Sequence, residues 1–383
     1  MTPRDRLRIS FAGGGTGGHI VPGLHLLERT LQELGANSER AVPVIEDLLW
    51  FTSGRAVEDR VLESVPDGFP WKRQVLALEP AGGGAPSHTR LLLKTPGSFL
   101  TARRELRKHR TQVLLGLGGF TTLPAVLAAR SLGIPVALLE INAASGKATR
   151  SLQRFATRIF HAWKGTLPGA VEDARQCLTG APVSPSVSQV GSGLGSREEA
   201  LEALAMDRTR PLLLVLGGSQ GAGSLNGFMR THRDDLLQGG LQVLHQCGPG
   251  KRSALPADSA HFRAVEFLAP ISRALQASTL VLCRGGASTL AEVAAAQRAA
   301  LVVPYPHHTD GHQERNAKEL GAGIRLVKDE ALNAACAAQI VHLALESGAL
   351  ERAEMERELG LAGHEDAAAR ILEELQQLAV KPT

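Results

Sequence analysis

Residues 13–19 (GGGTGGH) combine five glycines with a threonine and His19, between a short apolar run and a helix-like pattern. Glycine adds no packing surface and costs backbone entropy, so such a run indicates unusual dihedrals or a ligand held close to the main chain. Between a strand and a helix, it would present backbone N–H donors that suit a phosphate group. His19 adds an imidazole, a group that can act as an acid or a base, at the mouth of this turn. A tight turn without a ligand explains two glycines well and five poorly.

Three later segments have the same form, a glycine-rich turn between a strand-like run and a helix-like pattern. They are residues 116–120 (GLGGF), 217–222 (GGSQGA) and 283–292 (CRGGASTLAE). Because the loops that follow parallel strands gather at one edge of an open sheet, such turns are typical of ligand-binding edges. Their recurrence in the second half of the chain predicts two domains built on the same plan.

The segment of residues 283–292 places Ser288 and Thr289 at the start of a helix. Their hydroxyls, with the backbone N–H groups of that first turn, make an anion site suited to a diphosphate. Glu292 fits two interpretations, a capping box with Thr289 or a carboxylate that binds a ribose diol. The spacing slightly favours the capping box, and both interpretations can hold together.

A polar segment follows at residues 304–316, where His312 and Asn316 share one face of a helix and Gln313 lies beside them. Such side chains can bind sugar hydroxyls. Residues 307–312 contain three histidines, but no cysteine or carboxylate completes a known zinc spacing. We therefore predict no metal site.

The elements that must position these segments alternate between strand-like and helix-like runs, which predicts an α/β protein with parallel sheets. The strand-like runs are residues 7–11, 48–52, 113–115, 135–139, 212–216, 241–246, 263–267, 280–283 and 300–303. The helix-like runs include residues 20–34, 55–64, 123–132, 197–205, 288–297 and 313–320. We expect loops at residues 36–46 and 79–88, the second being rich in Gly and Pro.

A stretch rich in Gly, Pro and Ser, residues 179–197, predicts the connection between the two domains. We place the first domain at residues 1–182 and the second at residues 183–357. The last helix, residues 358–383, carries an apolar face and is expected to pack back on the first domain. Two doubly wound, Rossmann-like domains would then face each other across a cleft.

The composition is ordinary for a soluble globular protein: of 383 residues, 43% are hydrophobic and 21% are charged. We find no signal peptide, and no apolar run reaches the roughly 18 residues that span a bilayer. The four cysteines lie far apart and form no CxxC motif, which favours reduced thiols in a cytosolic protein.

Positive charge is concentrated in residues 90–110, which hold seven Lys or Arg against one Glu, whereas the formal net charge of the whole chain is only +4. Interleaved Leu and Phe residues make this stretch suit an anionic membrane surface. A solvated helix face explains the charge at least as well. Nucleic acid is a weaker candidate, because 4% of the residues are aromatic and no binding module is recognisable.

Five of these segments occur in the order and at the distances found in one known family. They are residues 14–19, 116–120, 217–222, 286–292 and 312–317. On these segments the chain resembles the MurG family of peptidoglycan N-acetylglucosaminyltransferases, from about Leu7 to the last helix. Each segment alone is a weak signal, but five in register are highly specific.

The resemblance implies a GT-B fold, in which the C-terminal domain holds UDP-N-acetylglucosamine and the N-terminal domain holds a lipid-linked acceptor. The implied reaction converts lipid I, undecaprenyl-pyrophosphoryl-MurNAc-pentapeptide, to lipid II. The implied location is peripheral, on the cytoplasmic side of the plasma membrane. No cofactor is implied beyond the sugar nucleotide, which is a substrate.

The resemblance also implies substrate contacts, with Glu292 on the ribose and the backbone of Leu268 reading the uracil. The implied donor-site residues are Thr16, Gly17, Gly18, Asn142, Ser219, Gln220, Leu268, Ala287, Ser288, Thr289, Leu290, Ala291, Glu292, His312, Gln313 and Asn316. The implied acceptor-site residues are Gly14, Gly15, Gly118, Gly119 and Phe120.

An inverting displacement of this kind needs a base for the acceptor hydroxyl and stabilisation of the departing diphosphate. His19 suits the base, and Glu140 is the other candidate. A purely structural role for His19, ordering the glycine turn, is only slightly less favoured. Helix N-termini and N–H groups around Ser219 and residues 287–289 would stabilise the leaving charge without a metal.

Two alternatives keep the fold and change the function. In the first, the chain is a related transferase for another lipid acceptor, such as diacylglycerol, which residues 90–110 would fit equally well. In the second, it is a non-catalytic UDP-sugar-binding protein. The only support for the second comes from Leu139, Ile141 and Ser184, which depart from the family pattern. A nicotinamide dehydrogenase is poorly supported, because residues 13–19 depart from GxGxxG.

Overall fold

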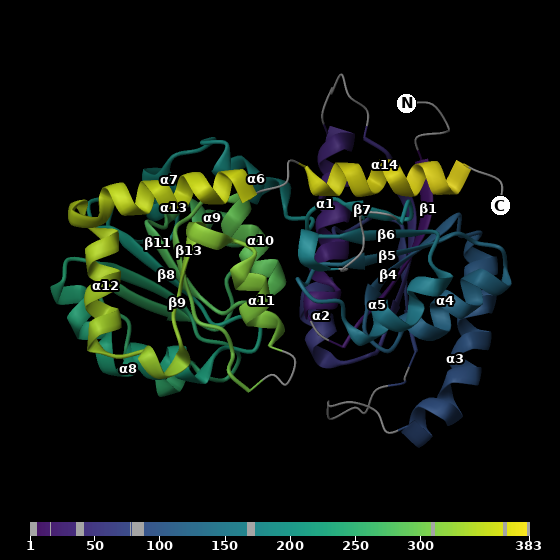
Figure 1. Ribbon diagram of the computed structural model, residues 1–383, viewed down its shortest axis with the longest axis horizontal. Coiled ribbons are helices and arrows are strands. Elements are labelled where there is room, and N and C mark those ends of the chain that lie inside the picture. The colour runs from purple at the N-terminus through teal and green to yellow at the C-terminus, as the bar shows by residue number, and fades with distance from the viewer. Residues whose placement is uncertain are drawn as a thin grey trace. The chain divides into compact units, whose positions relative to one another are not determined.

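The computed structural model describes residues 6–15, 17–35, 42–76, 78, 88–166, 173–307, 311–362 and 366–380, without the side chains of residues 35 and 88–93. It divides into two compact units, Met1–Pro185 with His364–Thr383, and Ser186–Gly363 (Figure 1). The sequence placed this boundary after residue 182. It also predicted one last helix at 358–383, whereas one helix ends at Ala362 in the second unit and another begins at Ala367 in the first.

The first unit is built on a seven-stranded parallel sheet with the strand order β3-β2-β1-β4-β5-β6-β7. Its strands are β1 Arg6–Gly13, β2 Val44–Thr52, β3 Trp71–Val75, β4 Val113–Gly118, β5 Val136–Glu140, β6 Arg158–His161 and β7 Gln176–Leu178. Its helices are α1 Val21–Gly35, α2 Ala56–Leu62, α3 His88–His109, α4 Thr122–Ser131, α5 Lys147–Leu152 and α14 Ala367–Val380, with short 3-10 helices that include Gly17–His19.

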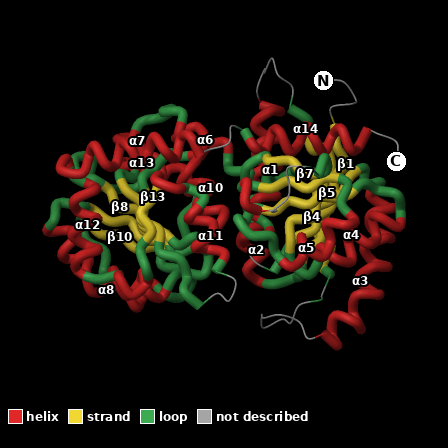
Figure 2. The backbone as a smooth tube through the Cα atoms, in the orientation of Figure 1, coloured by secondary structure: helices red, strands yellow, loops and turns green. Residues whose placement is uncertain are grey.

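Helices cover both faces of this sheet (Figures 1 and 2). On one face, Leu106 of α3 and Val126 of α4 pack in one buried cluster with Leu49 and Leu114 of the strands. On the other face, α1 packs beside α14. Because side chains alternate across a strand, a sheet covered on both faces needs apolar residues at nearly every position, as in the fully buried strand β5.

The second unit repeats this plan on a six-stranded parallel sheet, with the order β10-β9-β8-β11-β12-β13. Its strands are β8 Leu212–Leu216, β9 Gln242–Gln246, β10 Phe262–Val265, β11 Leu280–Cys283, β12 Ala300–Val302 and β13 Ile324–Leu326. Its helices are α6 Pro185–Gly191, α7 Arg197–Ala203, α8 Gly223–Gln238, α9 Ile271–Ala277, α10 Ala287–Ala295, α11 His312–Lys318, α12 Ala334–Ala344 and α13 Ala349–Ala362. The prediction of two doubly wound, Rossmann-like units is confirmed.

Each sheet has one point at which the strand order reverses. In the first unit the chain runs from β1 outward through β2 to β3, then returns to the other side of β1 with β4. In the second unit the reversal lies between β8 and β11. Ligands of open α/β sheets bind beyond the strand ends at such a point, because neighbouring loops diverge there. All four glycine-rich segments follow β1, β4, β8 or β11.

The sequence missed the edge strands β3, β7 and β13, and also β6, which lies next to the edge. These strands are three to five residues long, so they show little hydrophobic periodicity. The predicted loop at 36–46 is wrong for its last residues, since β2 begins at Val44. Helix α6 lies inside the stretch predicted as a connection, and the expected loop at 79–88 falls almost wholly outside the described residues.

Candidate functional site

In the first unit, the turns after β1 and β4 meet at the imidazole of His19. A Cβ atom placed on Gly118 would lie 2.8 Å from Cδ2 of His19, and one on Gly119 would lie 2.6 Å from the carbonyl oxygen of Gly14. Both of these glycines have positive φ angles, 107° and 80°. Glycine is therefore required at both positions by space as well as by dihedral. The exposed ring of Phe120 follows directly.

The imidazole of His19 is half-buried, and its Nδ1 atom lies 3.0 Å from the carbonyl oxygen of Gly14. A carbonyl oxygen only accepts, so Nδ1 carries the proton in the neutral ring and Nε2 is the basic nitrogen. Sequence reasoning offered His19 as either a base or a residue that orders the turn. This contact orders the turn and also assigns the tautomer that a base would need.

In the glycine turn after β1, one of the N–H donors that the sequence predicted for a phosphate is bound by the protein itself. The N–H of Gly15 donates to Oε1 of Glu58 over 2.6 Å, and its carbonyl accepts from Nη1 of Arg55 over 2.6 Å. A protein carboxylate therefore already satisfies this donor. Gly17 is buried and Gly18 is exposed, while Thr16 lies outside the described residues.

Glu58 is a site residue that sequence reasoning missed. Its side chain is fully buried, although it carries a carboxylate. Burial would raise the pKa of Glu58, but hydrogen bonds from Ser53 and from the backbone of Gly15 and Gly54 outweigh it, so the pKa is lowered. The sequence did contain a signal for Glu58. It is the third residue of a helix that follows β2, the strand beside β1, and a glutamate at that position commonly binds backbone N–H groups.

The other base candidate, Glu140, ends β5 and is also buried. One carboxylate oxygen accepts from the backbone N–H (3.1 Å) and the side-chain amide (3.0 Å) of Asn142, and the other from the N–H of Gly146 and the hydroxyl of Thr149, both at 2.7 Å. Four donors surround this carboxylate. The geometry therefore supports a role in fixing the loop that carries Asn142, rather than proton transfer.

In the second unit, the loop after β11 leads into α10, whose N-cap residue is Gly286. The capping box predicted between Thr289 and Glu292 is wrong, because the helix begins two residues before Thr289. Glu292 lies in its second turn, which leaves the ribose-binding interpretation. Ser288, in the first turn, has a buried hydroxyl with no hydrogen-bond partner among the described residues. An orphaned hydroxyl beside a helix N-terminus is what an anion site needs.

The remaining predicted residues of α10 contribute in different ways. Leu290 is fully buried, and its N–H donates to the carbonyl of Gly286 over 2.9 Å. Neither its side chain nor its N–H is therefore available to bind a ligand. Ala287 and Ala291 are also buried. Thr289 and Glu292, the other polar residues predicted in this helix, are both half-buried.

Helix α11 packs its first turn against the same loop. A Cβ atom on Gly285 would lie 2.4 Å from the carbonyl oxygen of Gln313. The fully buried Asn316 donates from its amide to the carbonyl of Gly285 over 3.1 Å, and the amide oxygen of Gln313 accepts from the N–H of Tyr305 over 2.9 Å. Asn316 therefore holds the loop in place. His312 is half-buried at the start of the helix.

Arg284 is a second residue that sequence reasoning missed. Its guanidinium donates to the carbonyls of Val303 and Pro304, to Oδ1 of Asp329 at 2.6 Å, and to the hydroxyl of Ser224 at 2.6 Å. These partners belong to three segments: the start of α8, the loop after β12 and the segment after β13. Arg284 thus ties the loop after β11 to all three. Its place between a strand and two glycines was the sequence signal that could have identified it.

The turn after β8 brings Ser219 and Gln220 to the surface, where both are exposed. Its glycines permit close packing, since a Cβ atom on Gly221 would lie 1.9 Å from the carbonyl oxygen of Cys247. Nζ of Lys251 donates to the carbonyl of Gln220 over 2.7 Å and so fixes the turn. Leu268, half-buried, lies beyond β10 at the same edge of the sheet.

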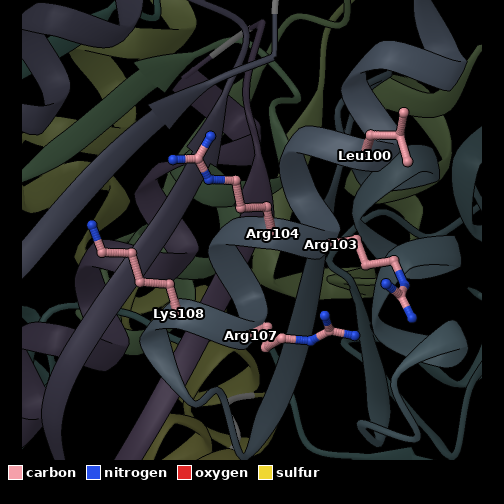
Figure 3. A pocket seen from close by; sticks show the side chains of 5 residues that line it. All are labelled: Leu100, Arg103, Arg104, Arg107 and Lys108. Carbon is pink, nitrogen blue, oxygen red and sulfur yellow. The ribbon is translucent and has the colours of Figure 1, made fainter.

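A separate surface feature lies on α3, where Arg103, Arg104, Arg107 and Lys108 line a hollow of about 280 Å³ together with the exposed Leu100. We call these four cations the basic ridge. Figure 3 shows Arg104 and Lys108 on one side of the helix and Arg103 and Arg107 on the other, as their four-residue spacing requires. Glu105 is the only acidic side chain among the residues of α3, the helix that carries the basic ridge. It forms an ion pair with Lys72 at 2.5 Å.

Two features are absent from the described residues. No group of three or more His, Cys, Asp or Glu side chains among them could hold a metal ion. No helix among them combines the length and the hydropathy that crossing a membrane would take.

The sequence matches known families over most of its length. Residues 9–161 match the glycosyltransferase family 28 N-terminal domain, and residues 212–371 match the family 28 C-terminal domain. Two curated relatives carry the same name, UDP-N-acetylglucosamine–N-acetylmuramyl-(pentapeptide) pyrophosphoryl-undecaprenol N-acetylglucosamine transferase. The one from Sorangium cellulosum is 33% identical over 98% of this chain and 89% of its own. The one from Neisseria meningitidis is 33% identical over 93% and 95%.

Solved structures agree on the fold. MurG of Acinetobacter baumannii superposes with a TM-score of 0.67 and 24% identity, covering 96% of this chain and 99% of that one. The calicheamicin glycosyltransferase CalG4 superposes with a TM-score of 0.64 and 14% identity over 97% and 98%. At these identities the likeness concerns the fold.

Proposed function

Because the chain belongs to glycosyltransferase family 28, we propose that it transfers N-acetylglucosamine from UDP-N-acetylglucosamine to lipid I and so makes lipid II for peptidoglycan. The chain is a hexosyltransferase with a GT-B fold. The observation that carries the proposal is the match, over nearly the full length of both chains, to relatives named for this transfer. Apart from the departures from the family pattern at Leu139, Ile141 and Ser184, no feature of the described residues favours diacylglycerol as the acceptor or a non-catalytic role.

The reaction is an inverting displacement. The muramyl 4-hydroxyl oxygen attacks the anomeric carbon of N-acetylglucosamine, a new C–O bond forms, and the bond from that carbon to UDP breaks. The hydroxyl proton goes to a base, and UDP leaves with the bonding electron pair. General base catalysis contributes about 10²–10⁴-fold to such a step.

His19 is the base in this proposal, and its Nε2 atom takes the proton. Two observations support the assignment: the contact from Nδ1 to the carbonyl of Gly14, and the close packing of Gly118 against the ring. Together these contacts hold one tautomer and one ring orientation. Gly14, Gly119 and the exposed Phe120 line the same turns and are proposed as acceptor contacts.

The second unit binds the donor in this proposal. The N-terminus of α10 and the orphaned hydroxyl of Ser288 support a diphosphate site, and a helix N-terminus contributes roughly 0.3–1 kcal/mol toward a negative charge. Glu292 binds the ribose diol, Gln313 and His312 bind the sugar, and Leu268 reads the base. Ser219 and Gln220 stabilise the leaving diphosphate, and no resident cofactor takes part.

The basic ridge supports a peripheral position on an anionic membrane. Each cation near such a surface contributes about 1 kcal/mol, so four cations beside an exposed leucine provide a substantial attraction. Since UDP-sugars and lipid I are cytoplasmic-side reactants, we place the protein on the cytoplasmic face of the plasma membrane.

The test is a transfer assay with radiolabelled UDP-N-acetylglucosamine, offered either a lipid I analogue or diacylglycerol in mixed micelles with EDTA present. We expect label in the lipid I product alone. Label in diacylglycerol would replace the proposed acceptor, and label in neither lipid would contradict the proposed activity. Restoration of activity only by added Mg²⁺ or Mn²⁺ would contradict the absence of a metal cofactor.

A further inference from the structure

We propose that Glu58 is a positioning residue for the transfer reaction, because its carboxylate fixes the peptide group that orients the imidazole of His19. The proposal rests on the proposed function and adds to it a residue that does not touch either substrate. It concerns the first unit alone, in which every contact used below lies.

The carboxylate of Glu58 is the centre of a buried network. Oε1 accepts from the N–H of Gly15 at 2.6 Å and from the N–H and hydroxyl of Ser53 at 3.0 and 2.5 Å. Oε2 accepts from the N–H of Gly54 at 2.8 Å and from Nη2 of Arg73 at 2.8 Å. A buried carboxylate without such donors would be strongly disfavoured, so the network holds the side chain in one position.

The carbonyl of Gly14 and the N–H of Gly15 are the two ends of one planar peptide group. Glu58 binds the N–H end at 2.6 Å, and Nδ1 of His19 donates to the carbonyl end at 3.0 Å. Rotation of this peptide group would break both contacts together. A charged acceptor at the N–H also polarises the carbonyl, which strengthens the hydrogen bond at its other end.

The next peptide group along the turn is held as well. Nη1 of Arg55, the residue before α2, donates to the carbonyl of Gly15 over 2.6 Å. Space is restricted too, because a Cβ atom on Gly14 would lie 2.5 Å from Oε1 of Glu58. The approach of the carboxylate is by itself enough to require glycine at this position.

A narrower explanation is that Glu58 only stabilises the start of α2. It is the third residue of that helix, and its Oε2 atom accepts from the N–H of Arg55 at 3.2 Å, as a helix-starting glutamate does. This contact explains neither the hydrogen bond to Gly15 nor the closeness to Gly14. The two explanations differ in what happens to His19 when the charge is removed.

The experiment compares Glu58→Gln and Glu58→Asp with the wild type, with Glu63→Gln as the matched control on an exposed carboxylate just after α2. In Glu58→Gln we expect kcat to fall roughly 10- to 100-fold, as when a reacting group is displaced by about 1 Å. The KM for UDP-N-acetylglucosamine, bound by the other unit, should stay within about twofold, and the acid limb of the kcat–pH profile should move to lower pH. Glu58→Asp keeps the charge and should recover part of the lost kcat.

The proposal is overturned if Glu58→Gln retains kcat within about twofold of wild type. It is equally overturned if kcat falls while the acid limb stays in place, since that result describes a stability role. If Glu58→Gln does not fold, Glu58→Asp carries the test, and a folded Glu58→Asp with unchanged kcat overturns the proposal.

A readout without turnover separates this proposal from the proposed function. In protein labelled with ¹⁵N at glycine and histidine, the amide proton of Gly15 should resonate far downfield, and the His19 ring should report a single Nδ1–H tautomer. Both signals should change in Glu58→Gln and not in Glu63→Gln. An inactive wild type with these changes would refute the function but not the positioning role. Unchanged signals would refute the positioning role whatever the activity.

Discussion

Nδ1 of His19 lies 3.0 Å from the carbonyl oxygen of Gly14, within the turn that follows the first strand. This contact commits Nδ1 to donation and leaves Nε2 as the nitrogen that can take a proton. The same backbone carbonyl lies against Gly119 of the second glycine turn. Two turns that are separated by about a hundred residues in the sequence thus both pack against the imidazole of His19.

The first prediction concerns proton transfer by His19. His19→Gln should lower kcat by about 10²–10⁴-fold, the range of general base catalysis, while the KM for UDP-N-acetylglucosamine stays near its wild-type value. Steady-state kinetics over pH 5–9 would measure both and should show that the acid limb of the wild-type profile is lost. A variant with near-normal turnover would remove His19 from the mechanism and leave it a residue that orders the turn.

The second prediction concerns the ribose. Glu292→Gln removes a charged acceptor from α10, and hydrogen bonds to charged groups contribute about 1.5–3 kcal/mol. We expect the KM for UDP-N-acetylglucosamine to rise by roughly 10- to 100-fold, since about 1.4 kcal/mol corresponds to a factor of ten. Glu346→Gln, on an exposed position of the same unit, is the control. Equal donor affinity of the two variants, measured by calorimetry with UDP, would exclude Glu292 from the site.

The third prediction concerns the basic ridge. Arg104→Ala combined with Lys108→Ala removes two cations worth about 1 kcal/mol each near an anionic surface, so binding to vesicles with 30% phosphatidylglycerol should weaken by roughly 25-fold. The wild-type affinity should also fall with salt. The control pair, Arg60→Ala with Arg370→Ala, removes two exposed cations of the same unit outside α3. If both pairs weaken vesicle binding equally, net charge and not the ridge is responsible.

The fourth prediction is a pH effect on stability from His245, which is buried in β9. Burial lowers its pKa from 6.5 to about 4, and its Nε2 atom lies 2.8 Å from Oδ1 of Asn226. The unfolded chain takes up a proton below pH 6.5 and the folded chain does not, so stability is lost as the pH falls from 6.5 through 4. The full loss is about 3 kcal/mol, at about 1.36 kcal/mol per pKa unit.

Urea unfolding at pH 7 and pH 4.5 measures this effect. His245→Gln, which cannot take up a proton, should lose less stability between the two pH values than the wild type does. The control is His342→Gln, because His342 is exposed and should behave like the wild type. A wild type and a His245→Gln variant with the same pH dependence would show that the imidazole is not kept neutral by burial.

The central strands were predictable from sequence because both of their faces are buried. Leu212–Leu216 and Leu280–Cys283 read as continuous apolar runs, and their bounds match the prediction. The edge strand Trp71–Val75 reads WKRQV and has one partner strand, so nothing in its residues distinguishes it from a loop. The break between α13 and α14 was missed because only α14 has a marked apolar face, so the residues of α13 do not show where that helix ends.

The glycine turns of the site were predictable because four turns with the same form are improbable by chance. The side chains that bind and hold these turns were not predictable. Glu58 is 43 residues from Gly15 in the sequence, and only the pairing of β2 with β1 brings them together. Arg284 likewise binds groups far along the chain at Ser224 and Asp329. A sequence pattern reports local spacing, and these contacts depend on the order of strands in the sheet.

The return of α14 to the first unit has a consequence for synthesis. Its apolar face, with Ile371, Leu372 and Leu375 buried, packs beside α1, and ion pairs at 2.9 Å join Arg29 to Asp366 and Arg158 to Glu374. A ribosome therefore delivers the last element of the first unit after the whole of the second. The second unit can complete its fold on the nascent chain before the unit that carries His19 has received its last helix.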